Sequence, residues 1–419
     1  DGYRLLVAGG EELEGVDFPE AMRLLGQMVG LDVDAIRAQR DGGGPARDPD
    51  APSKTDLYEL QEKLAAWYQE QLQKDSARVA REYCRDRGLS DEIIERFRIG
   101  YAPDSFDAVK AWGKQHAYSF ETMLAAGVLT KRNDDDPPTR AYDRWRHRLM
   151  FPIRNPQGRV IAFSGRVLDE DQKGGKYVNS PETRVFHKGA TLYGLAVARR
   201  SMREHDVCLL CEGQMDAIAC HAAGFDYAVA PQGTAFTSEQ ARLIKRYTAN
   251  LVLCFDGDSA GVAAALKSAP AFLPAGLNTR VVRLGADEDP DSLIQAHGAQ
   301  ALQQRIDAAE DFFSFVLAQE LEQNDDTPAG RTAAVQHVLE HVALLDSPII
   351  RNEYCQMLAE RLGLRLDAVF GELNRVLNRN RRKAAFRATD EPAGDADDTA
   401  VAAQPEDPVT AAEGMLLDL

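Results

Sequence analysis

Short apolar runs alternate with longer amphipathic segments between residues 202 and 310. The apolar runs cover residues 207–211, 251–255 and 281–284, and each has the length of a buried strand. The other segments have helical spacing and cover residues 215–223, 238–247, 260–272 and 290–308. Strands and helices in alternation predict an α/β unit whose parallel sheet is flanked by helices.

The region before this unit mixes both kinds of pattern. Residues 56–88 predict one long helix, and Ser90 begins a shorter helix that ends near Phe97. Strands are predicted over residues 149–153, 160–167 and 176–179, and a hairpin turn at Asn155, Pro156 and Gly158 joins the first two. Residues 54–201 are therefore expected to form a mixed α+β subdomain that precedes the α/β unit of residues 202–310.

The remaining regions differ in composition. Helices are predicted near residues 331–345, 350–362 and 366–378, so residues 311–387 are expected to form a small helical subdomain. Residues 40–53 carry Gly and Pro among charges and predict a linker after a short segment, residues 1–39. Residues 388–419 are rich in Ala, Asp, Glu and Pro and are expected to form an acidic, disordered linker.

The net charge of -17 is unevenly distributed. Residues 389–419 contain nine acidic residues and no Lys or Arg, whereas residues 140–188 contain eleven Lys or Arg against five acidic residues. This distribution argues against a basic coat over the whole protein. It predicts a basic surface next in sequence to the α/β unit.

The six cysteines lack the spacing of a disulfide framework and fit a reducing, cytosolic setting. Cys208 and Cys211 form a CxxC, but both fall in a predicted buried strand and no second ligand pair accompanies them. Core thiols are therefore favoured over a zinc site. No apolar run approaches the roughly 18 residues that a membrane span requires, so the chain is expected to be soluble.

Acidic residues stand where the apolar runs end. Glu212 follows the first run, Asp256 and Asp258 follow the second, and Asp289 and Asp291 come soon after the third. Because parallel α/β sheets bind ligands at the carboxyl ends of their strands, these carboxylates should converge. Such a group suits one or two divalent ions, and Glu212 could instead act as a general acid or base for an attacking hydroxyl.

Each acid also has a structural interpretation. A D-x-D pair taken alone is more often a solvated turn or a helix cap than a metal site. Three acidic strand ends in one α/β unit favour the metal site. Asp216, one turn into the helix after Glu212, is either a partner of the helix dipole or a residue that supports the ligands from behind.

A second group of candidate residues lies in the basic region. Cations, an aromatic ring and polar donors crowd into the stretches KYVNSPET and FHKG, residues 176–183 and 186–189. This mixture suits phosphate binding and base stacking, although an exposed strand with Lys and Tyr is usually only a solvated face. The row Arg144, Arg146 and Arg148 adds weight because arginines on one side of a strand bind phosphate well.

At these residues the chain resembles the DnaG-type bacterial DNA primases, whose RNA polymerase core contains a Toprim fold. Besides the acids, the resemblance is carried by RFRIGYAP at residues 96–103, RLMFPI at 148–153, GRVIAFSGR at 158–166, KYVNSPET and FHKG. It covers about residues 17–378. Several ordered motifs at family-like spacing make it specific.

The resemblance implies a nucleotidyltransferase that synthesises short RNA primers on single-stranded DNA, with one or two Mg²⁺ or Mn²⁺ ions at the acids. The metal-binding residues implied are Glu212, Asp216, Asp256, Asp258, Asp289 and Asp291, with Glu212, Asp256 and Asp258 as catalytic acids. The nucleotide- or DNA-binding residues implied are Arg148, Arg166, Lys176, Tyr177, Asn179 and Lys188.

The resemblance also implies partners and missing parts. The expected partners are the single-stranded DNA template, NTPs, a replicative helicase and single-stranded DNA-binding protein, in a primosome in the bacterial cytoplasm and away from membranes. Zinc is expected only with an N-terminal zinc-binding domain, of which residues 1–39 would be a remnant, and helicase contact through a C-terminal domain beyond residue 388. The chain departs from the family at Gln214, where an aromatic is usual, and at Gln232, where a small or apolar residue is usual.

Two other functions fit the same acids. Another Toprim protein, such as a topoisomerase or an OLD-type nuclease, would use them for strand cleavage, although RFRIGYAP and KYVNSPET favour a primase. A replication adaptor without catalysis would not need to bind Mg²⁺ or Mn²⁺ there.

Overall fold

The computed structural model describes residues 3–6, 12–16, 52–169, 175–233 and 235–390, with side chains described from residue 52 to residue 382 outside the same gaps. Residues 17–39 of the N-terminal segment, most of the linker over 40–53 and the tail from residue 391 lie outside the described residues. Two antiparallel strands, β1 (Tyr3–Leu6) and β2 (Glu12–Val16), are the described part of the N-terminal segment.

The helix predicted over residues 56–88 is two helices. α3 (Lys54–Leu72) ends before a 3₁₀ turn at Asp75–Ala77, and α4 (Arg78–Asp86) follows. Arg81 of α4 donates hydrogen bonds back to the carbonyls of Leu72 at 2.7 Å and Lys74 at 2.5 Å. The bond to Leu72 satisfies a carbonyl that the end of α3 leaves without a helical partner, which stabilises the break.

Three short helices and a four-stranded sheet complete the mixed subdomain. α5 (Asp91–Phe97) begins as predicted at Ser90, whose hydroxyl accepts the Ile93 N–H at 3.3 Å. α6 (Ala108–Gln115) and α7 (Phe120–Ala125) were not predicted. The sheet is antiparallel in the order β3-β6-β7-β8, with β3 (Gly100–Ala102), β6 (Arg148–Arg154), β7 (Val160–Val167) and β8 (Tyr177–Asn179).

The predicted hairpin between β6 and β7 is confirmed. The side-chain oxygen of Asn155 accepts the backbone N–H groups of Gln157 at 3.1 Å and Arg159 at 3.0 Å. Gly158 has a φ of +88°, which suits a residue without a Cβ. A separate two-stranded ribbon pairs β4 (Leu129–Thr130) with β5 (Tyr142–Asp143).

The second sheet has the order β14-β13-β12-β10-β11-β9. Its four inner strands are parallel: β10 (Cys208–Cys211), β11 (Ala228–Pro231), β12 (Asn250–Cys254) and β13 (Asn278–Val281). Its edges, β9 (Leu192–Tyr193) and β14 (Glu310–Asp311), pair antiparallel. The predicted parallel sheet is thus confirmed for the inner strands, and the edge strands make the whole sheet mixed.

The helices of this unit fix where the strand order reverses. α9 (Gln214–Ala222) joins β10 to β11, and α10 (Ser238–Lys245) then leads back past β10 to β12. α11 (Ser259–Phe272) joins β12 to β13 and packs with α10, whereas α9 packs with α12 (Pro290–His297). Right-handed crossovers therefore place α9 and α10 on opposite faces of the second sheet. The direction in which the chain adds strands reverses between β10 and β12.

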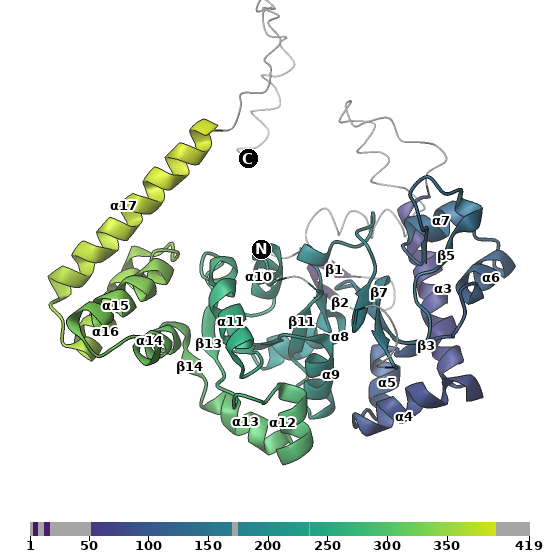
Figure 1. Ribbon diagram of the computed structural model, residues 1–419, viewed down its shortest axis with the longest axis horizontal. Helices are drawn as coiled ribbons and strands as arrows, with labels where there is room; N and C mark the ends of the chain where they lie inside the picture. Colours follow the sequence, from purple (N-terminus) through teal and green to yellow (C-terminus); the bar gives the residue numbers. More distant parts are fainter. Residues whose placement is uncertain (1–2, 7–11, 17–51, 170–174, 234, 391–419) are drawn as a thin grey trace, which may run out of the picture.

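The remaining helices extend the unit at both ends. α8 (Leu195–Glu204) follows β9, and α13 (Ala299–Asp307) is separated from α12 by Gly298, where one helix over 290–308 was predicted. The helical subdomain comprises α14 (Phe312–Gln323), α15 (Pro328–Val342), α16 (Pro348–Leu362) and α17 (Leu366–Asp390). In Figure 1 it lies on the side of the second sheet away from α3–α7, with α17 projecting outward beyond the predicted end at residue 378.

A shared core joins the mixed subdomain to the second sheet. Phe97 at the end of α5 stacks on Tyr193 of β9 with ring centroids 5.8 Å apart, and its edge meets His221 of α9 at 5.0 Å. The same core buries Phe151 of β6 with Ile218 of α9. The two parts are therefore packed as one unit, which fixes the distance between their facing surfaces.

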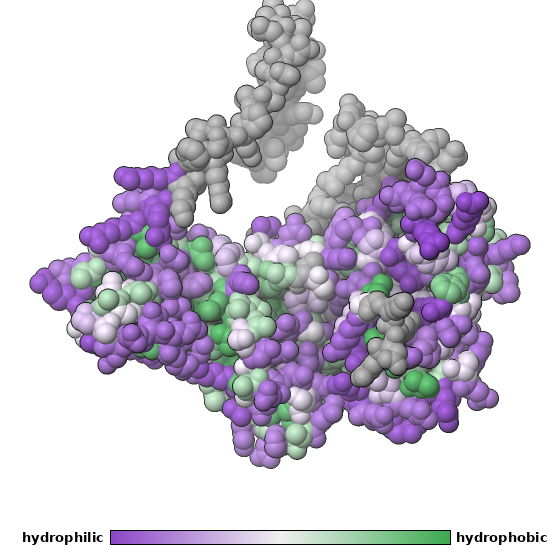
Figure 2. Space-filling view, in the orientation of Figure 1, coloured by the Kyte–Doolittle hydropathy of each residue, from purple (hydrophilic) through white to green (hydrophobic). Residues whose placement is uncertain are grey.

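The surface is largely polar. The face shown in Figure 2 is mostly hydrophilic, with apolar residues gathered toward its middle. Among the described residues, no helix is both long enough and apolar enough to cross a membrane.

Candidate active site

Two acidic residues follow the carboxyl ends of neighbouring strands at the point where the strand order of the sheet reverses. Cys211 and Cys254 end β10 and β12 and are paired in register. Glu212 directly follows the first, and Asp256 follows the second after one residue. Their carboxylates therefore lie at the switch point, where open α/β sheets form their ligand crevice.

Two glycines let the loops at this edge pack closely. A Cβ on Gly257 would lie 1.8 Å from the Gly285 carbonyl oxygen, and the Gly257 N–H donates to the Glu288 carbonyl at 2.9 Å. A Cβ on Gly261 would lie 2.1 Å from the Asp256 carbonyl oxygen. The loop after β12 thus contacts the loop after β13, which draws Asp256 toward Asp289.

A cavity of about 370 Å³ lies at this edge, between the second sheet and the mixed subdomain. Five of the six predicted acids line it: Glu212, Asp216, Asp256, Asp289 and Asp291. Four of the predicted nucleotide- or DNA-binding residues line it from the opposite side: Arg166, Lys176, Tyr177 and Asn179. The structure therefore brings nine of the twelve predicted site residues to one cavity.

The other three predicted residues do not line this cavity. Asp258 is the N-cap of α11, and its side chain accepts the Gly261 N–H at 2.8 Å. The buried Arg148 donates to the carbonyls of Gly165 at 2.9 Å and Gly175 at 3.1 Å, so it joins β7 to the segment that leads into β8. Their implied chemical roles stay predictions.

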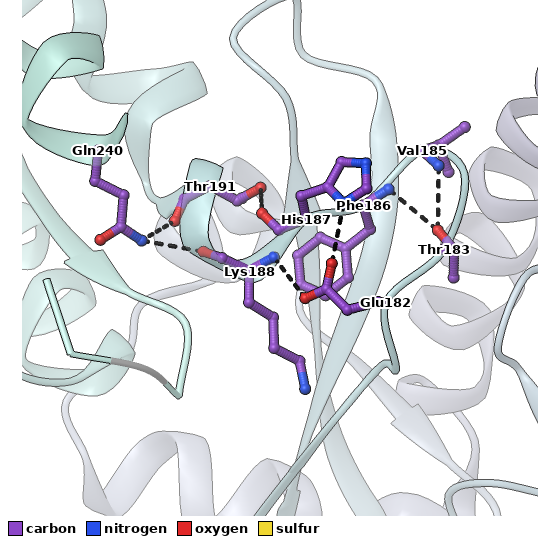
Figure 3. A network of polar contacts seen from close by, with 8 residues as sticks. All are labelled: Glu182, Thr183, Val185, Phe186, His187, Lys188, Thr191 and Gln240. Atoms are coloured by element: carbon purple, nitrogen blue, oxygen red, sulfur yellow. Dashed lines mark hydrogen bonds and ion pairs between the residues drawn. The ribbon is translucent and has the colours of Figure 1, made fainter. Parts of the chain in front are cut away.

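Lys188, the third of these, lies on the 3₁₀ turn Lys188–Ala190. Its backbone N–H donates to Glu182 at 2.9 Å, and its carbonyl accepts from the buried Gln240 of α10 at 3.1 Å. Figure 3 shows its side chain extending away from the other labelled residues. The turn is thus held against α10, while the ammonium group points away from these contacts.

Two of the cavity acids also have structural partners. Asp289 is the N-cap of α12 and accepts the Ser292 N–H at 2.6 Å. Asp291, only 3% exposed, forms an ion pair with Arg87 at the end of α4 and accepts from Gln295 at 2.6 Å. The helix-cap alternative therefore describes part of what Asp258 and Asp289 do.

Burial and crowding raise the pKa of the acids nearest the switch point. Burial, followed by the negative charges of Glu212 and Asp289, raises the pKa of Asp256 to about 6, and Lys176 opposes the shift. Burial, with Asp289 and Asp256, raises the pKa of Asp216 to about 7. Burial and Asp258 also raise the pKa of Glu212. The group accumulates negative charge that a bound cation would stabilise.

The opposite wall is built from β7, β8 and α4. Arg166 pairs in register with Tyr177, and Ser164 with Asn179, so all four side chains share one face of the sheet. The Arg166 guanidinium carbon lies 4.3 Å from the centre of the Tyr83 ring. This cation–π contact holds the guanidinium beside an aromatic surface.

Unpaired polar atoms collect around this cavity. Six buried side-chain atoms in its lining lack a hydrogen-bond partner among the described residues: Tyr83 Oη, Ser164 Oγ, Arg166 Nε, Asn179 Oδ1, Gln214 Nε2 and Asp256 Oδ1. Buried polar groups are almost always paired in folded proteins. The cluster therefore indicates a site for a polar ligand.

The donor set fits a divalent ion held jointly with a ligand. Within the described part of the chain, no three His, Cys, Asp or Glu side chains are arranged to hold a metal by themselves. Mg²⁺ does not need such a cage, because it binds through one or two carboxylates with water and substrate phosphates. The unpaired Asp256 Oδ1 beside Glu212 provides carboxylate oxygens of this kind.

Sequence reasoning missed part of the lining. Tyr83 and Arg87 reach the cavity only through the fold and stand in no motif that indicates it, whereas Ser164 stands in GRVIAFSGR but was not singled out as a site residue. Gln214 and Gln232 were noticed only as departures from a family pattern. Their shared burial against the cavity is visible only in the structure.

Three family models match successive parts of the chain. The DNA primase catalytic core, N-terminal domain, matches residues 67–199, and a Toprim-like domain matches residues 209–294. The DnaB-helicase binding domain of primase matches residues 313–367. A helicase-binding part was expected beyond residue 388, and this likeness instead falls on the helical subdomain.

Individual proteins similar to this chain agree with the family models. A DNA primase of Haemophilus influenzae is 37% identical over 357 residues, which are 84% of this chain and 58% of the relative. A DnaG primase catalytic domain solved bound to single-stranded DNA is 39% identical, with a TM-score of 0.67, over 74% of this chain and 97% of that one. The Aquifex aeolicus primase structure with zinc-binding and RNA polymerase domains is 26% identical, with a TM-score of 0.67, over 88% and 92%.

The sheet order and the acids at its switch point define a Toprim-type core joined to a basic mixed subdomain. The chain belongs to the DnaG-type DNA primase family. It spans 58% of the length of the Haemophilus influenzae relative.

Proposed function

We propose that this chain is the polymerase core of a DNA primase, a nucleotidyltransferase that makes short RNA primers on single-stranded DNA for replication. The observation that carries the proposal is the cavity in which acids of the second sheet face cations of the mixed subdomain. Family membership supports this, as does the relative solved with single-stranded DNA.

Each wall of the cavity has a distinct proposed task. Lys176 and Arg166 bind phosphate, and Tyr83 and Tyr177 offer ring faces to a base. Arg148 positions the segment that leads into β8 and carries Lys176, and Lys188 binds template phosphate outside the cavity. A nucleotide bound between the walls would hold its phosphates toward the acids.

Glu212 and Asp256 would hold one or two Mg²⁺ or Mn²⁺ ions, which when bound neutralise phosphate charge and activate the attacking hydroxyl. Asp216 supports these ligands from behind, and Asp289 and Asp258 add negative charge while capping their helices. Asp291 holds Arg87 at the cavity wall. In the alternative role, Glu212, which is exposed at the strand end, would accept a proton from a hydroxyl instead of holding an ion.

Further partners follow from the matched regions. The helical subdomain would contact a replicative helicase, since its likeness is to a helicase-binding domain of primase. Apart from the matched regions, single-stranded DNA-binding protein would be a further partner at the replication fork in the cytoplasm. Zinc would belong to a domain next to residues 1–39, as in the Aquifex aeolicus primase that was solved with its zinc-binding domain.

The test is primer synthesis. The purified chain is incubated with single-stranded DNA, labelled NTPs and Mg²⁺ or Mn²⁺, and the products are resolved on a denaturing gel. Short template-dependent RNA is expected from the wild type, and Asp256→Ala should abolish it. Asp287→Ala is the matched control, because Asp287 is an exposed acid near the same edge that does not line the cavity.

Two results would contradict the proposal. Cleavage of the DNA without RNA synthesis would move the assignment to a Toprim nuclease. Full RNA synthesis by Asp256→Ala would refute the assigned site.

A further inference from the structure

Two buried glutamines contact each other in the lining of the cavity. Gln214, the first residue of α9, is 6% exposed, and Gln232, directly after β11, is 2% exposed. The Gln232 side-chain nitrogen donates to the Gln214 side-chain oxygen at 3.4 Å. Both residues line the cavity beside the acids.

This contact leaves a hydrogen-bond donor unused. The Gln214 Nε2 group is buried and has no partner among the described residues. Turning over the Gln214 amide alone would place two NH₂ groups against each other, so with Gln232 oriented as it is here the free end of Gln214 is its Nε2 group. A buried donor without a partner is unfavourable, and a ligand that accepts its hydrogen bond would remove that cost.

An unused acceptor lies on the neighbouring wall. Asn179 of β8 has a buried Oδ1 without a partner in the described part of the chain. Its amide nitrogen rests against Gly233, where a Cβ would approach it to 2.7 Å. Gly233 directly follows Gln232, so Gln214, Gln232, Gly233 and Asn179 form a continuous polar wall.

One donor and one acceptor together match a hydroxyl group, which accepts one hydrogen bond and donates another. We propose that Gln214 and Asn179 bind the 2′-hydroxyl of the incoming ribonucleotide and so select NTPs over dNTPs. This rests on the proposed function. Gln214 is two residues from Glu212, so a ribose here would lie within reach of phosphates at the acids.

The chemistry of such a site gives strong selection. A pocket built to hydrogen-bond a hydroxyl discriminates against an analogue that lacks it, because its own buried polar groups then stay unpaired. Gln214 Nε2 and Asn179 Oδ1 are the buried groups that would stay unpaired with such an analogue. The wild type should therefore bind ATP at least about tenfold more tightly than 2′-deoxy-ATP.

The experiment measures binding without turnover. The whole chain is titrated with ATP, 2′-deoxy-ATP and 3′-deoxy-ATP in Mg²⁺, without template, by calorimetry. Gln214→Leu should weaken ATP binding about tenfold and leave 2′-deoxy-ATP binding unchanged, so that the preference disappears. Asn179→Leu should act in the same direction, whereas Asn179→Asp keeps the acceptor and should keep the ratio.

Gln71→Leu is the matched control. Gln71 at the end of α3 is also 6% exposed with an unpaired Nε2 among the described residues, but it does not line the cavity. It should leave both affinities unchanged. Melting curves establish that each variant is folded, and Asn179→Leu provides a second test if Gln214→Leu does not fold.

Several outcomes would overturn the proposal. These are a wild type that binds ATP and 2′-deoxy-ATP equally, a Gln214→Leu variant that weakens both equally, or a loss confined to 3′-deoxy-ATP. A wild type that makes primers but lacks the sugar preference refutes this inference alone. A wild type that neither binds nucleotide nor makes primers refutes the proposed function as well.

Discussion

Arg87 and Asp291 form an ion pair between residues 204 positions apart in the sequence. Arg87 is the C-cap residue that follows α4 of the mixed subdomain, and Asp291 lies in the first turn of α12 beside the second sheet. The pair closes one side of the cavity. The two halves of the candidate site are thus tied together by charge as well as by the apolar core around Phe97.

Arg87→Ala should destabilise the protein by about 2 kcal/mol. The Asp291 side chain is 4% exposed and would be left as an uncompensated buried charge, while the 36% exposure of Arg87 reduces the loss below that of a fully buried pair. Denaturant unfolding measures the effect. Arg85→Ala, at an exposed site of the same helix, should change little. If the Arg87→Ala loss persisted in an Asp291→Asn background, the ion pair would not be its cause.

The buried strands, the helix cap and the hairpin turn could be predicted from the sequence. The runs before Glu212 and Asp256 are buried strands that end where the acids begin, and the Ser90 cap and Asn155 turn are present. These features depend on neighbouring residues, so short patterns suffice. The convergence of Glu212 and Asp256 was predictable because parallel strands place their carboxyl ends at one edge.

Features set by tertiary contacts could not be predicted. β11 was not predicted, and β9 and β14 are two-residue pairings that exist only against their neighbours. β13 covers Asn278–Val281, where residues 281–284 were predicted, because Thr279 and Val281 face inward and the exposed Asn278 and Arg280 conceal the pattern. Tyr83 and Arg87 line the cavity only because distant segments pack together, so their place there could not be predicted either.

Gly257→Ala should disrupt the cavity while leaving the rest of the fold intact. The new methyl group would meet the Gly285 carbonyl oxygen at 1.8 Å, so the loop carrying Asp256 must move. Primer synthesis should fall at least tenfold, since a displacement of about 1 Å costs that much or more. Gly371→Ala is the control. Nothing lies within 4 Å of its added Cβ in α17, so it should stabilise the helix by about 0.5–1 kcal/mol. Normal synthesis by Gly257→Ala would mean that the loop contact does not position Asp256.

Lys176→Ala should weaken template or nucleotide binding in a salt-dependent way. Lys176 lines the cavity and lies close enough to Asp256 to oppose the rise of its pKa. Losing one phosphate contact should reduce the slope of log affinity against log salt concentration by about 1. Fluorescence anisotropy with labelled single-stranded DNA at several salt concentrations measures this slope. Lys114→Ala, on α6 outside the cavity, serves as control. An unchanged slope for Lys176→Ala would exclude the phosphate contact.

Asp143→Asn should change how stability depends on pH. Asp143 is 4% exposed and accepts the backbone N–H groups of Val109 at 2.7 Å and Lys110 at 3.0 Å, and burial raises its pKa to about 6. Above the ordinary pKa of 3.8 the unfolded chain has already lost this proton while the folded chain keeps it. The contribution of Asp143 to stability therefore falls as pH rises from about 4 to 6.

The variant cannot ionise at this position and should gain about 3 kcal/mol relative to wild type as the pH rises through this range. All three tryptophans lie in the mixed subdomain, at positions 67, 112 and 145, so their fluorescence during denaturant unfolding reports on this part. Asp135→Asn, at an exposed acid, should show no such trend. A difference between variant and wild type that is constant from pH 4 to 7 would contradict the raised pKa.

Divalent ions should stabilise the wild type through Asp256. Its Oδ1 atom is buried without a partner among the described residues, and burial together with neighbouring acids raises the pKa of Asp256, so a bound cation removes an unfavourable interaction. At a concentration 100 times the dissociation constant, Mg²⁺ or Mn²⁺ should add about 2.7 kcal/mol, and EDTA should reverse the gain. Melting temperatures with and without ions measure the effect for wild type, Asp256→Asn and Asp287→Asn. Only Asp256→Asn should lose the response, because Asp287 is exposed and outside the cavity. An equal rise in melting temperature in all three proteins would mean that the ions bind elsewhere on the acidic surface. Glu212 and Asp256 would then not be metal ligands.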